Sequence, residues 1–121
     1  MKLKVLPGAF SVCQILAEQP INRMQPFTFL SCTDEEISLV CPSEHVPANT
    51  VRREDGWRAF RIEGTLDFSL VGILSDIAGA LAREHISIFA LSTYNTDYVL
   101  VKAENFERAL SVLCRRGYER T

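Results

Sequence analysis

The chain has 121 residues and a formal net charge of −2, and its 47% of hydrophobic and 23% of charged residues are ordinary for a globular domain. No run of basic residues is longer than two, which leaves no electrostatic footprint for nucleic acid. No stretch reaches the roughly 18 apolar residues of a membrane span, and no signal peptide follows Met1. We therefore expect a cytoplasmic protein that binds neither nucleic acid nor a membrane.

The cysteines and histidines give no sign of catalysis or metal binding. The four cysteines form no Cys-x-x-Cys pair, and their spacings match no zinc site. Cys13 and Cys41 lie in apolar alternation, where a thiol behaves as a small hydrophobic group. His45 lies in a loop and His85 ends a predicted helix, without a nucleophile or base signature nearby. We expect reduced structural thiols, no cofactor, no metal and no catalytic residue.

The C-terminal half begins with a strand and a helix. Residues 57–62 alternate between apolar and polar side chains, which predicts a half-buried strand, and Asp55-Gly56 before it predicts a turn. Residues 70–84 carry one apolar stripe, which predicts an amphipathic helix with Ser69 as its N-cap and His85 at its end. The stripe consists of Leu70, Ile73, Leu74, Ile77, Ala78 and Leu81.

The remaining elements complete a βαββαβ order. Residues 86–91 predict a buried strand, 92–97 a polar turn and 98–102 another strand. A second helix is predicted from about 105 to 116 with Gly117 at its C′ position, and Tyr118 begins a short last strand. This order is that of a ferredoxin-like module, and it predicts an α+β fold.

The N-terminal half resembles a degenerate repeat of the C-terminal half. A shift of 61 residues places 31–34 on 92–95, and a shift of 50 places 9–12 on 59–62. The difference of 11 residues is about the length of one helix, so the first repeat has lost most of its first helix. The polar stretch 42–55 weakens or replaces the second helix. Thr33-Asp34-Glu35-Glu36 matches a helix capping box, but the strand pattern that follows indicates a turn. We expect the sheet of the first repeat to borrow cover from the second repeat or another chain, with intertwined halves in a homodimer.

Two segments suit a small ligand. The strand-to-helix junction at 67–73 gathers free amides and the positive end of a helix dipole, which favours a carboxylate. Gly72 there permits close approach of a ligand, although tight helix–strand packing explains it equally well. In the turn 92–97, Asp97 could accept hydrogen bonds from an α-ammonium group, and ordinary turn chemistry is the alternative.

The residues from Phe68 to Val101 resemble the ACT domain family, most specifically in the string Ser92-Thr93-Tyr94-Asn95-Thr96-Asp97-Tyr98 with Leu100-Val101. More closely, they are similar to small tandem ACT proteins related to the regulatory modules of aspartate kinases and to CASTOR-type arginine sensors. Residues 33–40 look like the matching signature of a first ACT repeat. The resemblance implies two ferredoxin-like ACT modules with antiparallel sheets and helices on one face. The first, degenerate module spans 1–56 and the second 57–121, with elements open to exchange between them.

The resemblance also implies a function. It implies a non-catalytic regulatory or sensor module that binds an amino acid between ACT units, often across a dimer. It implies that the site is lined by Ser69, Val71, Gly72, Ile73, Thr96 and Asp97. The alternative is an interaction subunit that docks onto an enzyme of amino-acid metabolism and has a vestigial pocket. A small enzyme is the least favoured reading, because no paired acid–base set is visible.

Overall fold

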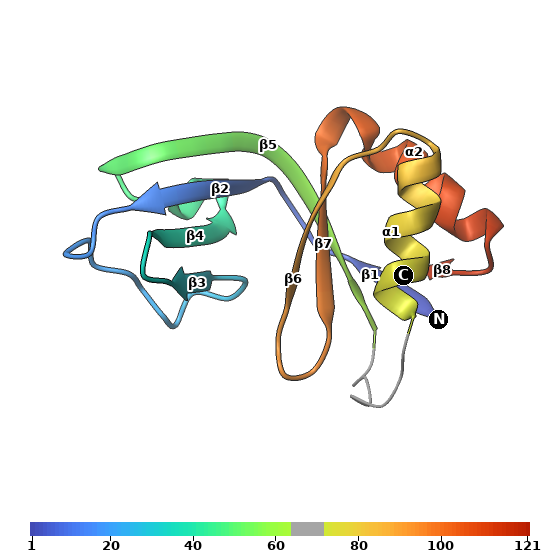
Figure 1. Ribbon diagram of the computed structural model, residues 1–121, viewed down its shortest axis with the longest axis horizontal. Helices are drawn as coiled ribbons and strands as arrows, with labels where there is room; N and C mark the ends of the chain where they lie inside the picture. The colour runs from blue at the N-terminus through green and yellow to red at the C-terminus, as the bar shows by residue number, and fades with distance from the viewer. Residues whose placement is uncertain (64–71) are drawn as a thin grey trace. The chain divides into compact units, whose positions relative to one another are not determined.

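A computed structural model describes residues 1–63 and 72–121 (Figure 1). Two compact units divide the chain: Met1–Pro7 with Arg58–Thr121 form the first, and Gly8–Trp57 form the second. Strand β5 (Thr50–Ile62) contributes residues to both units. The boundary of the two modules at 56/57 stays a prediction.

The unit that contains the C-terminal half has the predicted βαββαβ order. After β5 come α1 (Ile73–Arg83), β6 (Ile88–Ser92), β7 (Asp97–Lys102), α2 (Ala103–Arg115) and β8 (Glu119–Arg120). Strand β7 pairs with β5 and β6, so β6 is an edge strand and only partly buried, where the sequence predicted a buried one. The α+β class is confirmed.

An unpredicted strand, β1 (Lys2–Val5), completes this sheet. It pairs antiparallel with β5, Leu3 opposite Ile62, and parallel with β8, Leu3 opposite Arg120. The sheet is therefore mixed, and the prediction of a purely antiparallel sheet is wrong. The alternation of Lys2 and Lys4 with the inward Leu3 and Val5 is the strand signal that the sequence analysis passed over.

Both helices pack on one face of these strands (Figure 1). Helix α1 buries Ile77, Ala80 and Leu81, which confirms the amphipathic pattern, although the helix begins at Ile73 and not at residue 70. Helix α2 places Phe106 6.3 Å from Phe60 between ring centroids. The buried core of the unit comprises Leu3, Phe60, Ile62, Ile77, Ala80, Leu81, Ile86, Val99, Val101, Phe106, Ala109, Leu110, Val112 and Leu113.

Both helices end in a Schellman motif. After α2, Gly117 has φ 103° at C′ as predicted, and the amide of Tyr118 donates to the carbonyl of Leu113 at 3.2 Å. After α1, His85 takes the same C′ position with φ 58°, and the amide of Ile86 donates to the carbonyl of Leu81 at 2.9 Å. His85 is thus a left-handed residue at the end of its helix, where glycine is usual.

The second unit is a four-stranded sheet in the order β3-β4-β2-β5. Its other strands are β2 (Phe10–Ile15), β3 (Phe29–Cys32) and β4 (Ile37–Pro42). The turn predicted at Asp55-Gly56 is wrong, because both residues lie within β5. Phe10 faces Trp57 and Val12 faces Glu54, so the register shifts there, and Gly56 has φ 86°. A glycine with positive φ at a register shift indicates a β-bulge.

The second unit covers one face of its own sheet without a full helix. Between β4 and β5 a single 3₁₀ turn, η1 (Ser43–His45), stands where the sequence predicted a weakened helix, and residues 16–28 form turns. Cys13, Ile15, Leu39 and Cys41 are buried, with Ile21, Ile37 and Val46 packed against them. The expectation that this face depends on borrowed cover is therefore wrong, since residues 21 and 46 belong to the same unit.

The turns β3–β4 and β6–β7 have the same internal pattern of hydrogen bonds. The amide of Thr33 donates to the carbonyl of Glu36 at 2.9 Å, and that of Thr93 to the carbonyl of Thr96 at 2.8 Å. In both turns the threonine hydroxyl also donates to that carbonyl at 3.2 Å. Thr33 thus matches Thr93, a shift of 60 residues, and the 61-residue shift used above is one residue off. The reading of residues 33–36 as a turn is confirmed.

Candidate functional site

The six predicted ligand-binding residues fall into three groups. Ser69 and Val71 lie outside the described residues, so their placement stays a prediction. Gly72 and Ile73 stand at the start of α1. Thr96 and Asp97 stand where the β6–β7 turn enters β7.

Gly72 is the N-cap of α1 and not a residue of its first turn. It adopts φ 90° and ψ −6°, and its carbonyl accepts the amide of Asp76 at 2.7 Å. A Cβ built on Gly72 would meet nothing within 4 Å, so neither helix–strand packing nor a close backbone approach within the described residues explains the glycine. The left-handed backbone explains it, because L-residues with a side chain avoid that conformation.

Thr96 connects the turn to the end of β5. Its side-chain hydroxyl donates to the backbone carbonyl of Ile62 at 2.7 Å, and only 7% of the residue is exposed. A hydroxyl that already donates to a buried carbonyl positions the backbone more readily than it binds a ligand. Its bond also means that β7 starts at the end of the sheet where β5 stops. The segment that leads to α1 leaves from this same end.

Asp97 lies on the face of the sheet that the helices cover. It pairs in register with Ser92, whose hydroxyl donates to the Asp97 carboxylate at 2.5 Å. Side chains alternate along a strand, so Asp97 shares its face with the buried core residues Val99 and Val101. The carboxylate therefore stands on the face and at the end of the sheet from which α1 starts.

A pocket of about 450 Å³, open space included, lies beside Thr96. Besides Thr96 it is lined by Arg61, Glu63, Asn95 and Tyr98. The Arg61 guanidinium donates to the Tyr98 hydroxyl and to the Glu63 carboxylate, both at 3.4 Å, and these bonds raise the pKa of Arg61. Asp97 is not part of this lining. Arg61 is not among the residues predicted from the sequence, although it takes a polar position in an alternating strand.

The first turn of α1 carries one acidic group, which a neighbouring cation and a phenol hold in place. Arg116 donates to the Asp76 carboxylate, and the Tyr118 hydroxyl donates to the same carboxylate at 2.8 Å. These bonds lower the pKa of Asp76, the bond from Arg116 most. The ion pair offsets the negative charge that Asp76 would otherwise bring to the start of the helix.

The structure thus gathers part of the predicted site. Thr96 and Asp97 stand at the sheet end from which the chain continues toward Gly72 and Ile73. The hydroxyls of Ser92, Thr93 and Thr96 donate within the turn or to Ile62, and not to the start of α1.

The family model of the ACT domain matches residues 52–115, which is more than half of the chain. The chain belongs to the ACT domain family. The match covers most of β5, both helices and the Thr96-Asp97 turn, so the predicted site lies inside the ACT domain.

Curated relatives of this ACT domain protein are amino-acid sensors by name. The chain is 33% identical over 104 residues to the "Cytosolic arginine sensor for mTORC1 subunit 1" of Rattus norvegicus. This match covers 80% of the chain and 31% of that protein. The counterpart from Homo sapiens is 43% identical over 61 residues, 50% of this chain and 18% of that protein. The chain thus spans less than a third of the length of these relatives.

Solved structures share the fold over nearly the whole chain. The crystal structure of protein Atu0741 from Agobacterium tumefaciens has a TM-score of 0.86 at 28% identity and covers 99% of this ACT domain protein and 91% of that chain. The alpha and beta subunits of an aspartokinase match with a TM-score of 0.63 at 16% identity, covering 95% and 96% of the two chains. At that identity the aspartokinase match establishes the fold alone. In the part of the chain that the structure describes, neither helix is long and apolar enough to cross a membrane.

Proposed function

We propose that this ACT domain protein is a regulatory or sensor module that binds a free amino acid and catalyses no reaction. Membership of the ACT family and the name of its arginine-sensing relatives support this function. The observation that carries the proposal is the bond from Thr96 to Ile62, because it sets the acidic corner at the sheet end that leads to α1.

The chemistry of an amino acid suits the two ends of this site. An α-ammonium group would pair with the Asp97 carboxylate, a charge-assisted hydrogen bond. An α-carboxylate would accept the amides at the start of α1, where the helix dipole favours an anion. Ser69, Val71, Gly72 and Ile73 would line that end. A neighbouring module or a second copy of the chain would bring the two ends into reach of one molecule.

Only the second module keeps the acidic corner under this proposal. The matching turns support the tandem division into a degenerate module at 1–56 and a complete one at 57–121. The 60-residue shift aligns Asp97 with Ile37, which packs against the apolar core of its unit. An isoleucine there cannot pair with an ammonium group, so we infer that the first module has lost this part of the site.

A homodimer is part of the proposal. Strand β6 pairs only with β7 among the described strands, so its other edge is open. The partly exposed Ile88 and Leu91 on this strand would favour an edge-to-edge contact with a second copy. The homodimer and a cytoplasmic location accord with a sensor of free amino acids. Sedimentation velocity on the whole chain tests the dimer, and a monomer at micromolar concentration would overturn that part.

A thermal-shift screen of the whole chain against the twenty amino acids tests the ligand. A selective ligand at a hundred times its Kd stabilises the fold by about 2.7 kcal/mol, which a melting curve resolves. We expect one amino acid or a small group of them to raise Tm, and Asp97→Ala to abolish the rise while the fold stays intact. Glu36→Ala, which removes an exposed carboxylate from the matching turn, should leave the response unchanged.

No rise with any amino acid at millimolar concentration would refute the sensor. The alternative, an interaction subunit with a vestigial pocket, predicts that outcome together with a co-purified enzyme of amino-acid metabolism. A response that survives Asp97→Ala would refute the role given to Asp97.

A further inference from the structure

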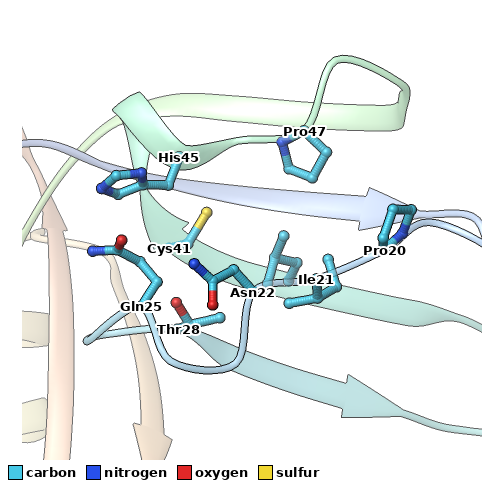
Figure 2. A pocket seen from close by; sticks show the side chains of 9 residues that line it. Pro20, Ile21, Asn22, Gln25, Thr28, Cys41, His45 and Pro47 are labelled. Atoms are coloured by element: carbon cyan, nitrogen blue, oxygen red, sulfur yellow. The ribbon is translucent and has the colours of Figure 1, made fainter.

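A pocket lies in the second unit, apart from the site described above (Figure 2). Its cavity volume is about 120 Å³, below the roughly 300–1,000 Å³ of drug-sized ligand pockets, so it suits only a small molecule. Leu39 and Cys41 of β4 contribute to it, together with residues 20–28 and the segment that starts at η1. Its complete lining is Pro20, Ile21, Asn22, Gln25, Thr28, Leu39, Cys41, His45 and Pro47.

The pocket occupies the face where a ferredoxin-like module packs its helices. In this unit residues 16–28 and the turn η1 cover that face. Turns and a 3₁₀ segment fill less space than two α-helices, which leaves room above Leu39 and Cys41. On the matching face of the other unit, Phe106, Leu110 and Leu113 of α2 lie in the buried core and occupy the corresponding space.

One wall of the pocket is fixed in place by buried polar contacts. Ser43, in η1, shares a hydrogen bond of 2.7 Å with the hydroxyl of Ser11, which is fully buried. Ser11 also donates to Asp55 at 2.5 Å, and Arg53 donates to the same carboxylate at 2.9 Å. The amide of Ser43 donates to the carbonyl of Ala9 at 2.9 Å. These bonds hold η1, and with it His45, against β2 and β5.

The opposite wall is also ordered before any ligand arrives. The Asn22 side chain accepts the amide of Met24 at 3.0 Å, and the amide of Gln25 donates to the carbonyl of Asn22 at 3.2 Å. Phe27 packs edge-on against Phe10, with ring centroids 6.3 Å apart, and takes φ 61°. A left-handed phenylalanine is unusual, and such strain is found where the fold needs a fixed side-chain direction. Thr28 follows it into the pocket (Figure 2).

The lining combines aliphatic surface with neutral hydrogen-bonding groups. Ile21, Leu39 and two prolines supply the apolar part, and Asn22, Gln25 and Thr28 supply amide and hydroxyl groups. Among the described residues, no lysine, arginine, aspartate or glutamate lines the pocket. Burial raises the pKa of the Cys41 thiol to about 11, so it stays uncharged at neutral pH. His45, with Glu44 3.6 Å from its Nε2, stands at the rim and is the lining residue that can carry charge.

We propose that this pocket binds a small uncharged molecule that joins a compact aliphatic group to a carboxamide. The aliphatic group would lie against Leu39 and Ile21, and the carboxamide would exchange hydrogen bonds with Gln25 and Asn22. A charged relative of the same shape would find no acidic or basic lining residue other than His45, and water screens pairing with that exposed side chain, which disfavours ions here. Ordered walls lower the entropic cost of binding.

Titration of ¹⁵N-labelled chain with isobutyramide, followed by amide chemical shifts, tests the proposal. Isobutyrate and isobutylammonium keep the branched carbon skeleton and change only the charge. We expect saturable shifts at residues 20–28, 39–41 and 45–47 with isobutyramide, and at least tenfold weaker binding of both ions. Equal binding of the ions, or shifts confined to other residues, would overturn the proposal.

Variants locate the binding. Ile21→Trp should fill the pocket and Gln25→Leu should remove an amide at similar size, so each should weaken isobutyramide binding at least fivefold. Met24→Ala, in the same segment but 89% exposed, is the matched control and should change nothing. The amide spectrum shows whether Ile21→Trp folds. If it does not, the Gln25→Leu variant tests the proposal, and unchanged isobutyramide binding by that variant would overturn it. Shifts at 72–76 and 92–97 report the amino-acid site, so the two proposals fail independently.

Discussion

Tyr118 donates its phenolic hydrogen to the Asp76 carboxylate at 2.8 Å, which joins the segment between α2 and β8 to the first turn of α1. Arg116 donates to the same carboxylate. Burial and this bond raise the pKa of Tyr118 from 10.0 to about 12. One carboxylate thus holds together the two helices of the ACT domain.

This contact predicts a loss of stability in alkali. A phenol whose pKa is higher in the folded than in the unfolded state stabilises the fold below pH 10, and that contribution disappears as pH rises toward 12. We expect the urea midpoint to fall across this range, and to fall less steeply in Tyr118→Phe. The Cys41 thiol also has a raised pKa and titrates in the same range. The Tyr118→Phe change is therefore compared in a Cys41→Ala background, which removes the contribution of that thiol. Equal slopes in the wild type and in Tyr118→Phe would disprove the contribution of Tyr118.

Gly72→Ala tests why the N-cap of α1 is glycine. The site has room for a methyl group, but its φ of 90° strains any L-residue with a Cβ. We expect a loss of about 1–2 kcal/mol in the free energy of unfolding, measured by urea denaturation. Gly79→Ala, inside the helix with its nearest neighbour at 3.6 Å, should instead be neutral or stabilising by up to about 1 kcal/mol. Stability retained in Gly72→Ala would show that the backbone there relaxes freely.

Thr96→Val should destabilise the domain. The change keeps the shape of the side chain and removes the hydroxyl that donates to the buried carbonyl of Ile62, a bond that valine cannot replace. We expect a loss of about 1–3 kcal/mol by chemical denaturation. Thr96→Ser retains the hydroxyl and is the control, and it should recover most of the difference. If Val and Ser variants are equally stable, the bond does not determine the position of the turn.

His85→Gly should stabilise the chain. His85 has φ 58° at C′ of α1, where glycine avoids the steric cost of a side chain, about 1–2 kcal/mol. We expect a gain of up to about 1 kcal/mol, because added freedom in the unfolded state offsets part of the relief. The reverse change after α2, Gly117→Ala, should lose about 1–2 kcal/mol. A destabilised His85→Gly variant would mean that the imidazole makes a contact worth more than the strain.

Periodicity predicted the elements that carry their own local signals. Helix α2 has a clean apolar stripe and a glycine at C′, so its position follows from the sequence to within two residues. The start of α1 was harder, because Ser69 and Gly72 are both acceptable N-caps and only the backbone angle of Gly72 distinguishes them. The sequence Asp55-Gly56 predicted a turn because glycine readily adopts a positive φ. The same property suits the β-bulge that Gly56 forms, with φ 86°.

Long-range pairing was beyond the sequence. Nothing local tells that β1 pairs with β5 and β8, because a four-residue strand specifies no partner. The candidate site was predictable in its residue types and not in their directions. Thr96 and Asp97 are adjacent, but the Thr96 hydroxyl donates to the backbone of Ile62, whereas the Asp97 carboxylate accepts a bond from Ser92.

Strand β1 also sets the order in which the chain can fold during synthesis. Residues 8–57 are contiguous, so all partners within that unit have been synthesised before β6 is made. Lys2–Val5 instead pair with Phe60–Ile62 and with Glu119–Arg120, both far along the chain, and loops of that length close slowly. We expect pulse-labelled hydrogen exchange during refolding to protect the amides of β2 and β4 before those of β1. Until these distant partners pair with it, β1 is an exposed strand edge and a target for chaperones.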